Sequence, residues 1–172
     1  MRGRAAETDL AVFRRLMDVN YFSTVMLAQA ALPALRESRG HLVVISSVVG
    51  HVAPPNRSGY AASKHAVQGF MNALRAEEAA TGLHVLTVCP GWARTNMSMN
   101  ALEPDGRPHG QMDETTARGL EPATVAASVL TAIARRRRAA YPAGLKERVA
   151  LALARWAPGV LARVMAGRAA AP

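Results

Sequence analysis

The spacing of apolar residues changes along this chain, and the changes divide it into predicted elements. The spacing is helical over 10–38 and again over 60–80. Two short runs, 42–46 and 83–88, are rich in β-branched residues. Such runs are typical of strands that are buried on both faces of a parallel sheet. The pattern therefore favours an α/β architecture.

The helix predicted over 60–80 has an apolar and a polar face. Its core stripe is expected to consist of Val67, Phe70, Met71 and Leu74. The residues expected to face away from the core are Gln68, Asn72, Arg75 and Glu78.

After the second strand the periodicity weakens. Residues 96–120, called the flap below, are rich in Met, Gly, Pro and polar residues, which predicts one short helix in a mobile segment. Met97, Met99 and Leu102 are expected to give the flap an apolar inner wall, although Met also serves as a plain gap filler. The remaining elements of this part are a helix and a short strand, predicted at 121–135 and 139–141.

The last part of the chain, 145–168, alternates apolar residues with Arg and Lys. This pattern predicts an amphipathic helix that is broken near Pro158. We therefore divide the chain into a domain of residues 1–144 and a C-terminal amphipathic helical tail of residues 145–172. Packing on the domain or on a partner subunit is one interpretation of the tail, and lying on a membrane surface is the other.

Composition limits the possible classes of protein. The chain has 172 residues, half of them apolar, which suits one ordered domain. Its single cysteine excludes an internal disulfide and suits the cytosol, and neither a signal peptide nor an apolar run long enough to span a membrane is visible. The five histidines are scattered without ligand spacing, so no metal site is predicted.

The net charge of +9 includes a run of four arginines at 135–138. A solvated helix end, where cations complement the helix dipole, is the simplest interpretation of that run. A basic surface can also attract an anionic cofactor or acidic lipid headgroups. Aromatic residues are few and do not interleave with the arginines, so nucleic-acid binding is not expected.

A tyrosine and a lysine are spaced for proton-transfer chemistry. Tyr60 and Lys64 are four residues apart in a predicted helix, so they lie on the same face. Because a nearby cation favours the phenolate, we expect Lys64 to lower the pKa of Tyr60 from its usual value of ~10 toward working pH. Such a phenol can act as a general acid and base. An exposed helix with an ordinary Tyr and Lys is the alternative interpretation of this pair alone.

Three further features accompany this pair. Ser47 follows the first predicted strand, at the position where open α/β sheets bind ligands, or else it simply opens a turn. Asn20 lies inside the first predicted helix, where an amide usually faces solvent. Residues 90–95, Pro-Gly-Trp-Ala-Arg-Thr, directly follow the second strand, and an ordinary turn is the alternative there.

Taken together and in this order, these features resemble the short-chain dehydrogenase/reductase family. The likeness extends from Phe13 to about Pro142. It implies that residues 1–144 form a partial Rossmann-like domain, the C-terminal half of a doubly wound parallel-sheet α/β fold. It also implies an NAD(P)-dependent oxidoreductase that transfers hydride between nicotinamide and a carbonyl or alcohol.

The resemblance implies a role for each matching residue. Tyr60 would exchange a proton with the substrate oxygen, and Ser47 would hydrogen-bond that oxygen. Lys64 would lower the pKa of Tyr60 and hold the nicotinamide ribose together with it. Asn20 would hold a water that links Lys64 to solvent. The residues that would bracket the nicotinamide and its phosphates are Pro90, Gly91, Ala93 and Thr95, although Val or Ile is more common at the position of Ala93.

One element of the family pattern is absent. No glycine-rich turn of the kind that receives a pyrophosphate at a helix N-terminus precedes Asn20. The chain is therefore expected to lack the N-terminal cofactor-binding half of the domain, which distinguishes NAD from NADP, and to bind either dinucleotide weakly or not at all alone. A misplaced start codon or split gene, a decayed remnant, and a half that pairs with another chain are the open explanations.

The family usually pairs subunits through the helices that correspond to those of Asn20 and Tyr60, so a homo-oligomer is expected for a complete form. The expected partner is a small, hydrophobic carbonyl or alcohol substrate, and the expected location is the cytoplasm, with membrane contact through the tail left open. Two alternative functions are a non-catalytic half-domain that acts as an interaction module and a basic amphipathic membrane-surface protein.

Overall fold

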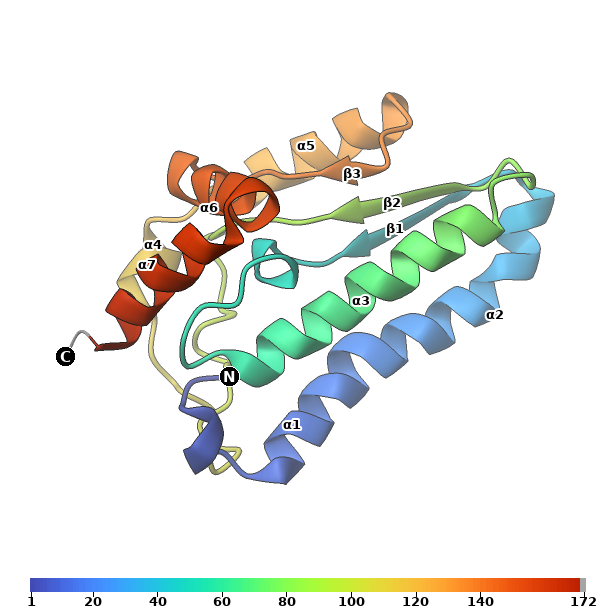
Figure 1. The fold of residues 1–172 in the computed structure, drawn as a ribbon. Coiled ribbons are helices and arrows are strands. Elements are labelled where there is room, and N and C mark those ends of the chain that lie inside the picture. The colour runs from blue at the N-terminus through green and yellow to red at the C-terminus, as the bar shows by residue number, and fades with distance from the viewer. Residues whose placement is uncertain (171–172) are drawn as a thin grey trace.

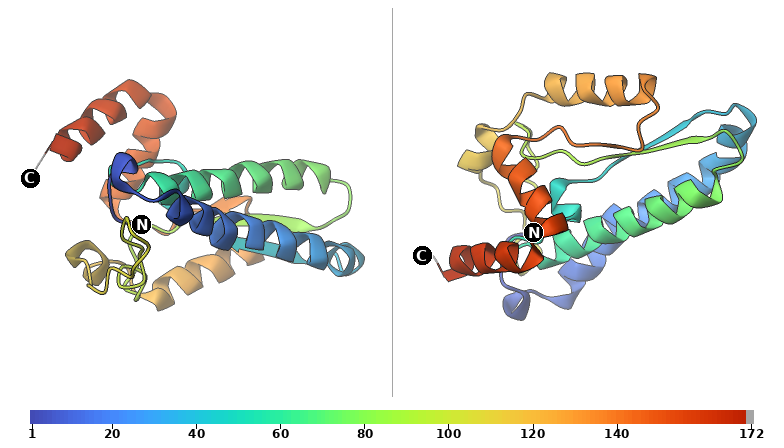
Figure 2. Two further views of the ribbon diagram at one scale, coloured as in Figure 1. Left: turned by 90° about the horizontal axis from the view of Figure 1, so that it is seen from below. Right: turned by 45° about the horizontal axis from the view of Figure 1, so that its top comes forward.

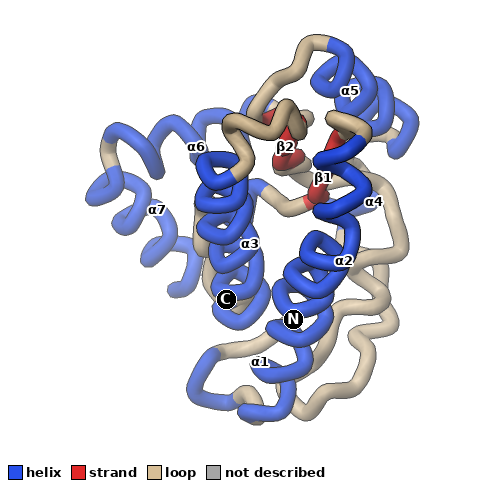
Figure 3. Tube along the Cα trace, turned by 90° about the vertical axis from the view of Figure 1, so that its right-hand side faces the viewer, coloured by secondary structure: helices blue, strands red, loops and turns tan. Residues whose placement is uncertain are grey.

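The computed structural model of the chain describes residues 1–170 and has helices on both faces of a parallel sheet (Figure 1). The strands are β1 (His41–Ile45), β2 (His84–Val88) and β3 (Ala139–Ala140), in the order β1-β2-β3. The helices α2 (Ser23–Glu37) and α3 (Ser58–Glu77) cover one face of the sheet, and α5 (Pro122–Ala134) covers the other (Figure 3). The predicted α/β architecture is therefore confirmed.

The register of the strands brings their carboxyl ends together. Ile45 pairs with Val88, and Val88 pairs with Ala140. Because all three strands are parallel, the segments that follow them leave the sheet at the same edge. That edge positions the candidate site.

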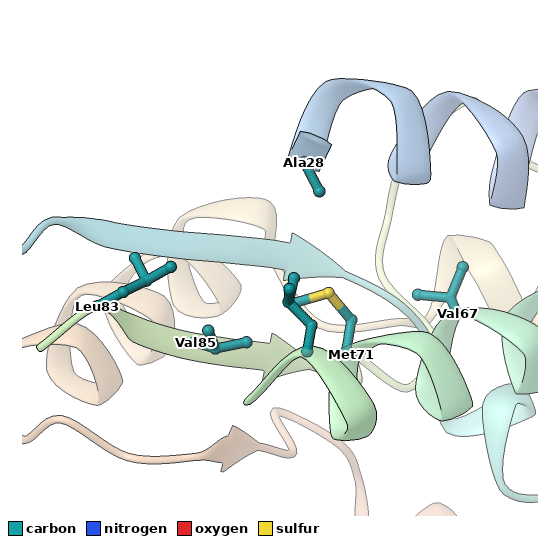
Figure 4. Close-up of a cluster of buried hydrophobic side chains, with 6 residues drawn as sticks. Ala28, Val67, Met71, Leu83 and Val85 are labelled. Carbon is teal, nitrogen blue, oxygen red and sulfur yellow. The ribbon is translucent and has the colours of Figure 1, made fainter. Parts of the chain in front are cut away.

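The core consists of two layers that follow the alternation of side chains along β2. Val85 faces α2 and α3, where it joins the cluster in Figure 4, whereas Leu86 and Val88 face α5. This alternation explains why all five residues of β2 are buried. The first layer consists of Ala28, Val67, Met71, Leu74, Leu83 and Val85.

The predicted core stripe of α3 is confirmed for Val67, Met71 and Leu74, which are buried. The prediction that Gln68 and Glu78 face away from the core was wrong. Glu78 is only 2% exposed because it forms an ion pair with Arg36 of α2, and that pairing makes burial of a carboxylate tolerable. Gln68 is buried beneath the candidate site, where it donates a hydrogen bond to Cys89.

The first predicted helix is continuous over its expected length, but its hydrogen bonding changes in the middle. An α-helix, α1 (Leu10–Met17), passes into a π-helical turn over Asp18–Phe22 and then into α2. Such turns are rare and are often found at functional sites. This turn contains Asn20.

The flap contains one short helix, α4 (Glu114–Ala117), as predicted. Its expected apolar inner wall is different, however. Leu102 packs against a cluster of Met1, Val12 and Leu16, while Met97 and Met99 are exposed. The N-terminal segment thus holds the flap, with the Arg2 N–H donating to the Leu102 carbonyl at 2.7 Å.

The tail forms two helices, α6 (Leu145–Trp156) and α7 (Pro158–Ala170), which are joined at the predicted break (Figure 2). Residues 171–172 of the predicted tail lie outside the described residues. Among residues 1–170, no helix combines the length and the apolar character that crossing a membrane requires.

Candidate active site

The segments that follow β1 and β2 form the floor of the candidate site. The Val48 N–H donates to the Pro90 carbonyl at 2.9 Å, and the Ser46 N–H donates to the Val88 carbonyl at 2.7 Å. These bonds continue the parallel pairing past the ends of the strands. They hold the segment that carries Ser47 beside the segment that begins at Pro90.

Ser47 caps a short 3-10 turn, Val48–Gly50, and its hydroxyl accepts the Val49 N–H at 3.1 Å. The Ser47 side chain also lies close enough to the Tyr60 phenol, which comes from the first turn of α3, to lower the pKa of Tyr60. The structure therefore brings together two side chains that are thirteen positions apart in sequence.

Lys64 lies one turn after Tyr60, and its Nζ is 5.9 Å from the centroid of the Tyr60 ring. The ammonium group donates a hydrogen bond to the Ile45 carbonyl, at the end of β1, at 3.3 Å. This bond ties α3 to the carboxyl edge of the sheet. Tyr60, Lys64 and Ser47 thus converge at the mouth of β1.

The electrostatics of Tyr60 differ from the prediction. Burial raises its pKa above the usual value, since a phenolate loses more hydration than a phenol, and interactions with Ser47 and Arg57 only partly oppose this effect. Desolvation also lowers the pKa of Lys64. The expectation that Lys64 lowers the pKa of Tyr60 was therefore wrong for this structure, in which Arg57 is the cation that does so.

Asn20 reaches the candidate site through a neighbouring residue. Its Nδ2 donates to the Ser63 hydroxyl at 3.0 Å, and that hydroxyl donates to the Tyr60 carbonyl at 2.9 Å. Ser63 is completely buried and directly precedes Lys64. The π-helical turn is therefore linked to the turn of α3 that carries Tyr60 and Lys64.

Residues 90–95 begin beside this cluster and lead away from it. The Gly91 N–H donates to the Pro142 carbonyl at 3.0 Å, and a side chain at position 91 would approach the Ala143 Cβ to 3.1 Å. Ala93 forms a bridge with Leu120 at the end of the flap. Pro90 and Gly91 follow the carboxyl end of β2 closely, and Thr95 is exposed farther along the same segment.

Two residues that sequence reasoning did not assign to the site support it. Gln68 is one turn after Lys64 on α3, and its Nε2 donates to the Cys89 sulfur at 2.9 Å. The i, i+4, i+8 spacing of Tyr60, Lys64 and Gln68 is the signal that predicts their common face. Arg57 precedes Tyr60 by three residues and stacks on Trp92, with 4.8 Å from its Cζ to the ring centroid.

Within residues 1–170, no group of three or more His, Cys, Asp and Glu side chains is arranged to hold a metal ion.

Comparison with known proteins gives a consistent result. A family model described as "short chain dehydrogenase" matches residues 1–106. "Dehydrogenase/reductase SDR family member 7B" of Danio rerio is 46% identical over 169 residues, which are 98% of this chain and 55% of that protein. The protein of the same name from Bos taurus is 43% identical, and 52% of its length is covered. The chain thus spans about half the length of the curated relatives it matches.

Solved structures of similar fold include a short-chain dehydrogenase from Burkholderia cenocepacia in complex with NADP. It has a TM-score of 0.74 and 25% identity, covering 100% of this chain and 67% of that one. A short-chain dehydrogenase from Sphingobium yanoikuyae in complex with NADPH has a TM-score of 0.72 and 26% identity, covering 95% of this chain and 59% of that one.

The environment of Cys89 leads to a prediction about thiol reactivity. Burial raises the pKa of Cys89 to about 11, and the thiolate is the reactive form. At pH 8 only about one thiol in a thousand is then ionised, compared with about a quarter for a free thiol. We expect the folded chain to react with a thiol-specific disulfide reagent at least ~100-fold more slowly than the same chain in urea. Equal rates would contradict this account of the site floor.

Proposed function

Because this chain belongs to the short-chain dehydrogenase family, we propose that its convergent Ser47, Tyr60 and Lys64 perform the proton chemistry of an NAD(P)-dependent oxidoreductase. The observation that carries this proposal is the meeting of these three side chains at the carboxyl edge of the sheet. Ligands bind at this edge in open α/β sheets. The proposed reaction is interconversion of a carbonyl and an alcohol.

In the proposed reaction, Tyr60 transfers the proton. Its raised pKa keeps the phenol protonated at neutral pH, so in the direction of carbonyl reduction it can donate that proton to the substrate oxygen. The Ser47 hydroxyl can donate a hydrogen bond to the same oxygen and stabilise the charge that develops there. In the direction of alcohol oxidation, Tyr60 must first lose its proton.

We propose that the residues of the site can hold a nicotinamide nucleotide, NAD or NADP, which supplies or accepts the hydride when it is bound. The Lys64 ammonium has three N–H donors, and one of them bonds to the Ile45 carbonyl. Its remaining donors suit ribose hydroxyls. Tyr60 would contact the same ribose, and Pro90, Gly91, Ala93 and Thr95 would line the nicotinamide and phosphate side.

Asn20 supports the proposed site from the π-helical turn between α1 and α2. Its amide fixes Ser63, and Ser63 fixes the turn of α3 that carries Tyr60. A water held beside Asn20 would connect Lys64 to solvent and replace the proton that Tyr60 transfers.

A small apolar carbonyl compound is the substrate class we propose. The cytoplasm is the compartment we propose.

The test of this proposal is carbonyl reduction with NADH or NADPH. It is measured with this chain and with any longer form that the same reading frame encodes upstream of Met1. We expect turnover where a glycine-rich strand–turn–helix is also present, and weak or no dinucleotide binding without it. In the active form, Tyr60→Phe should lower kcat by about 10²–10⁴-fold and leave dinucleotide binding largely intact.

Tyr21→Phe is the matched control, because Tyr21 packs edge-on against Phe70 away from Ser47. Its kcat should stay within about twofold of the parent. Undiminished turnover of Tyr60→Phe would refute the assignment of Tyr60. A chain that binds neither dinucleotide in either form would instead favour a non-catalytic interaction module.

We also propose that the protein forms a homo-oligomer through the outer face of α1, the π-helical turn and α2. Val19, Phe22 and Met26 are exposed there at i, i+3 and i+7, which places them on a single face. An exposed apolar face of this kind is typical of a protein interface. Phe22→Glu should shift the mass measured by light scattering to that of a monomer. Leu130→Glu, on the exposed side of α5, should not, and an unchanged mass of Phe22→Glu would exclude this face.

The tail supports a second proposed contact, with an anionic membrane surface. Leu145, Val149, Ala152 and Trp156 follow one another at i, i+4, i+7 and i+11 on α6 and form an exposed stripe, with Leu145 79% and Trp156 81% exposed. The charged residues exposed on the two tail helices are all basic: Lys146, Arg148, Arg155, Arg163 and Arg168. An apolar stripe with cationic neighbours suits acidic lipid headgroups.

We expect the chain to co-sediment with vesicles that contain phosphatidylserine, and to do so less as salt increases. Trp156→Glu should lower the bound fraction at least threefold, because it removes apolar contact and adds a repelled charge. Leu130→Glu is the control, since it adds the same charge at a similarly exposed position on α5. Absence of salt-sensitive binding would leave packing on a partner subunit as the role of the tail.

A further inference from the structure

Arg57 is the residue through which the flap, residues 90–95 and Tyr60 meet. It precedes the first turn of α3, and its side chain is 16% exposed. Its guanidinium lies over the Trp92 ring, with its Nη2 3.6 Å from Asp113 Oδ2 in the flap. Tyr60 follows three residues later, in the first turn of α3.

The flap is linked to the segment that follows β2 at two places. At its end, the Leu120 N–H donates to the Trp92 carbonyl at 2.8 Å, and the Arg94 N–H donates to the Leu120 carbonyl at 2.9 Å. At Asp113, it meets Arg57, which also holds Trp92. One planar cation therefore contacts both the flap and the loop on the floor side of the candidate site.

Arg57 belongs to a network of charged side chains from the N-terminal segment and the flap. Asp113 is shared by two arginines, Arg57 and Arg2, and it also faces His109 at 3.8 Å. Glu103 pairs with His109 and raises the pKa of Arg2 in this network. Arg57 and Arg2 share the Asp113 carboxylate, and of the two only Arg57 lowers the pKa of Tyr60.

The interaction between Arg57 and Tyr60 is reciprocal. Burial and the charge of Arg2 lower the pKa of Arg57, which is about 10, although Tyr60 raises it, and Arg57 in turn lowers the pKa of Tyr60. The buried Met1 amino group also faces Arg57, and its pKa falls to about 6, chiefly through desolvation, so at neutral pH it adds little positive charge.

We propose that Arg57 is a positioning residue that clamps the flap and Trp92 beside Tyr60 and supplies the positive charge that the phenol faces. This role rests on the proposed function of Tyr60, which it deepens. Arg57 does not contact the reacting atoms. It sets the position of the flap and the proton affinity of the residue that does the chemistry.

The test compares two substitutions that lose the planar clamp and differ in charge. Arg57→Lys keeps a cation but cannot reproduce the guanidinium stacking, whereas Arg57→Met removes the charge as well. The chain is labelled at tyrosine Cζ, Tyr60 is assigned with Tyr60→Phe, and the phenol is titrated by NMR. The pKa of Tyr60 should lie about one unit higher in Arg57→Met than in Arg57→Lys.

Hydrogen exchange of the flap supplies the second readout. Residues 111–118 should exchange at least threefold faster in Arg57→Met than in the parent chain, because Asp113 loses one of its cations. Arg94→Met is the control, since Arg94 pairs with the exposed Glu121 just outside the flap and its removal should leave the Tyr60 titration unchanged.

Equal Tyr60 titration in Arg57→Lys and Arg57→Met would overturn the electrostatic part of the proposal. Unchanged flap exchange in Arg57→Met would overturn the clamp. Neither measurement needs turnover, so failure here is distinguishable from failure of the proposed oxidoreductase activity.

Discussion

The packing of α3 against the sheet is the constraint on which the site depends. Val67, Met71 and Leu74 bury one stripe of α3 against Val85 and Leu83, and this packing fixes the rotation of the helix about its axis. Once the rotation is fixed, Tyr60 and Lys64 must point toward the carboxyl edge of β1. The hydrogen bond from Lys64 to the Ile45 carbonyl also holds α3 against the end of β1. The packing of the core therefore also fixes the geometry of the site.

Three buried polar side chains inside this arrangement are held by specific partners. Glu78 has Arg36, Ser63 has Asn20, and Gln68 has Cys89. A buried polar group without a partner costs free energy, so each of these pairs also fixes the relative position of the two segments that it joins. The pairs Glu78–Arg36 and Ser63–Asn20 join α3 to the first long helix, which explains how a distant asparagine comes to support the turn of α3 that carries Tyr60.

Desolvation dominates the electrostatics of the site. The same burial that brings Tyr60 and Lys64 together raises the pKa of the phenol and lowers that of the ammonium, so both groups are driven toward their neutral forms. Arg57 opposes this effect at Tyr60. The acidity of the phenol therefore depends on how burial and charge balance across α3, Trp92 and the flap, and not on the Tyr60–Lys64 spacing alone.

The sequence by itself determined the α/β architecture, the order of the elements and the common face of Tyr60 and Lys64, because apolar periodicity and local spacing encode secondary structure and the faces of single helices. The place of Ser47 beside Tyr60 was implied by the resemblance to the family. Only the tertiary structure decided the burial of Gln68 and Glu78, the packing of Leu102 on Met1, and the direction of the pKa shift of Tyr60. Each of these depends on residues that are far away in sequence and come into contact only when the chain folds. Desolvation and ion pairing arise only from such long-range contacts, so they cannot be predicted from a local sequence pattern.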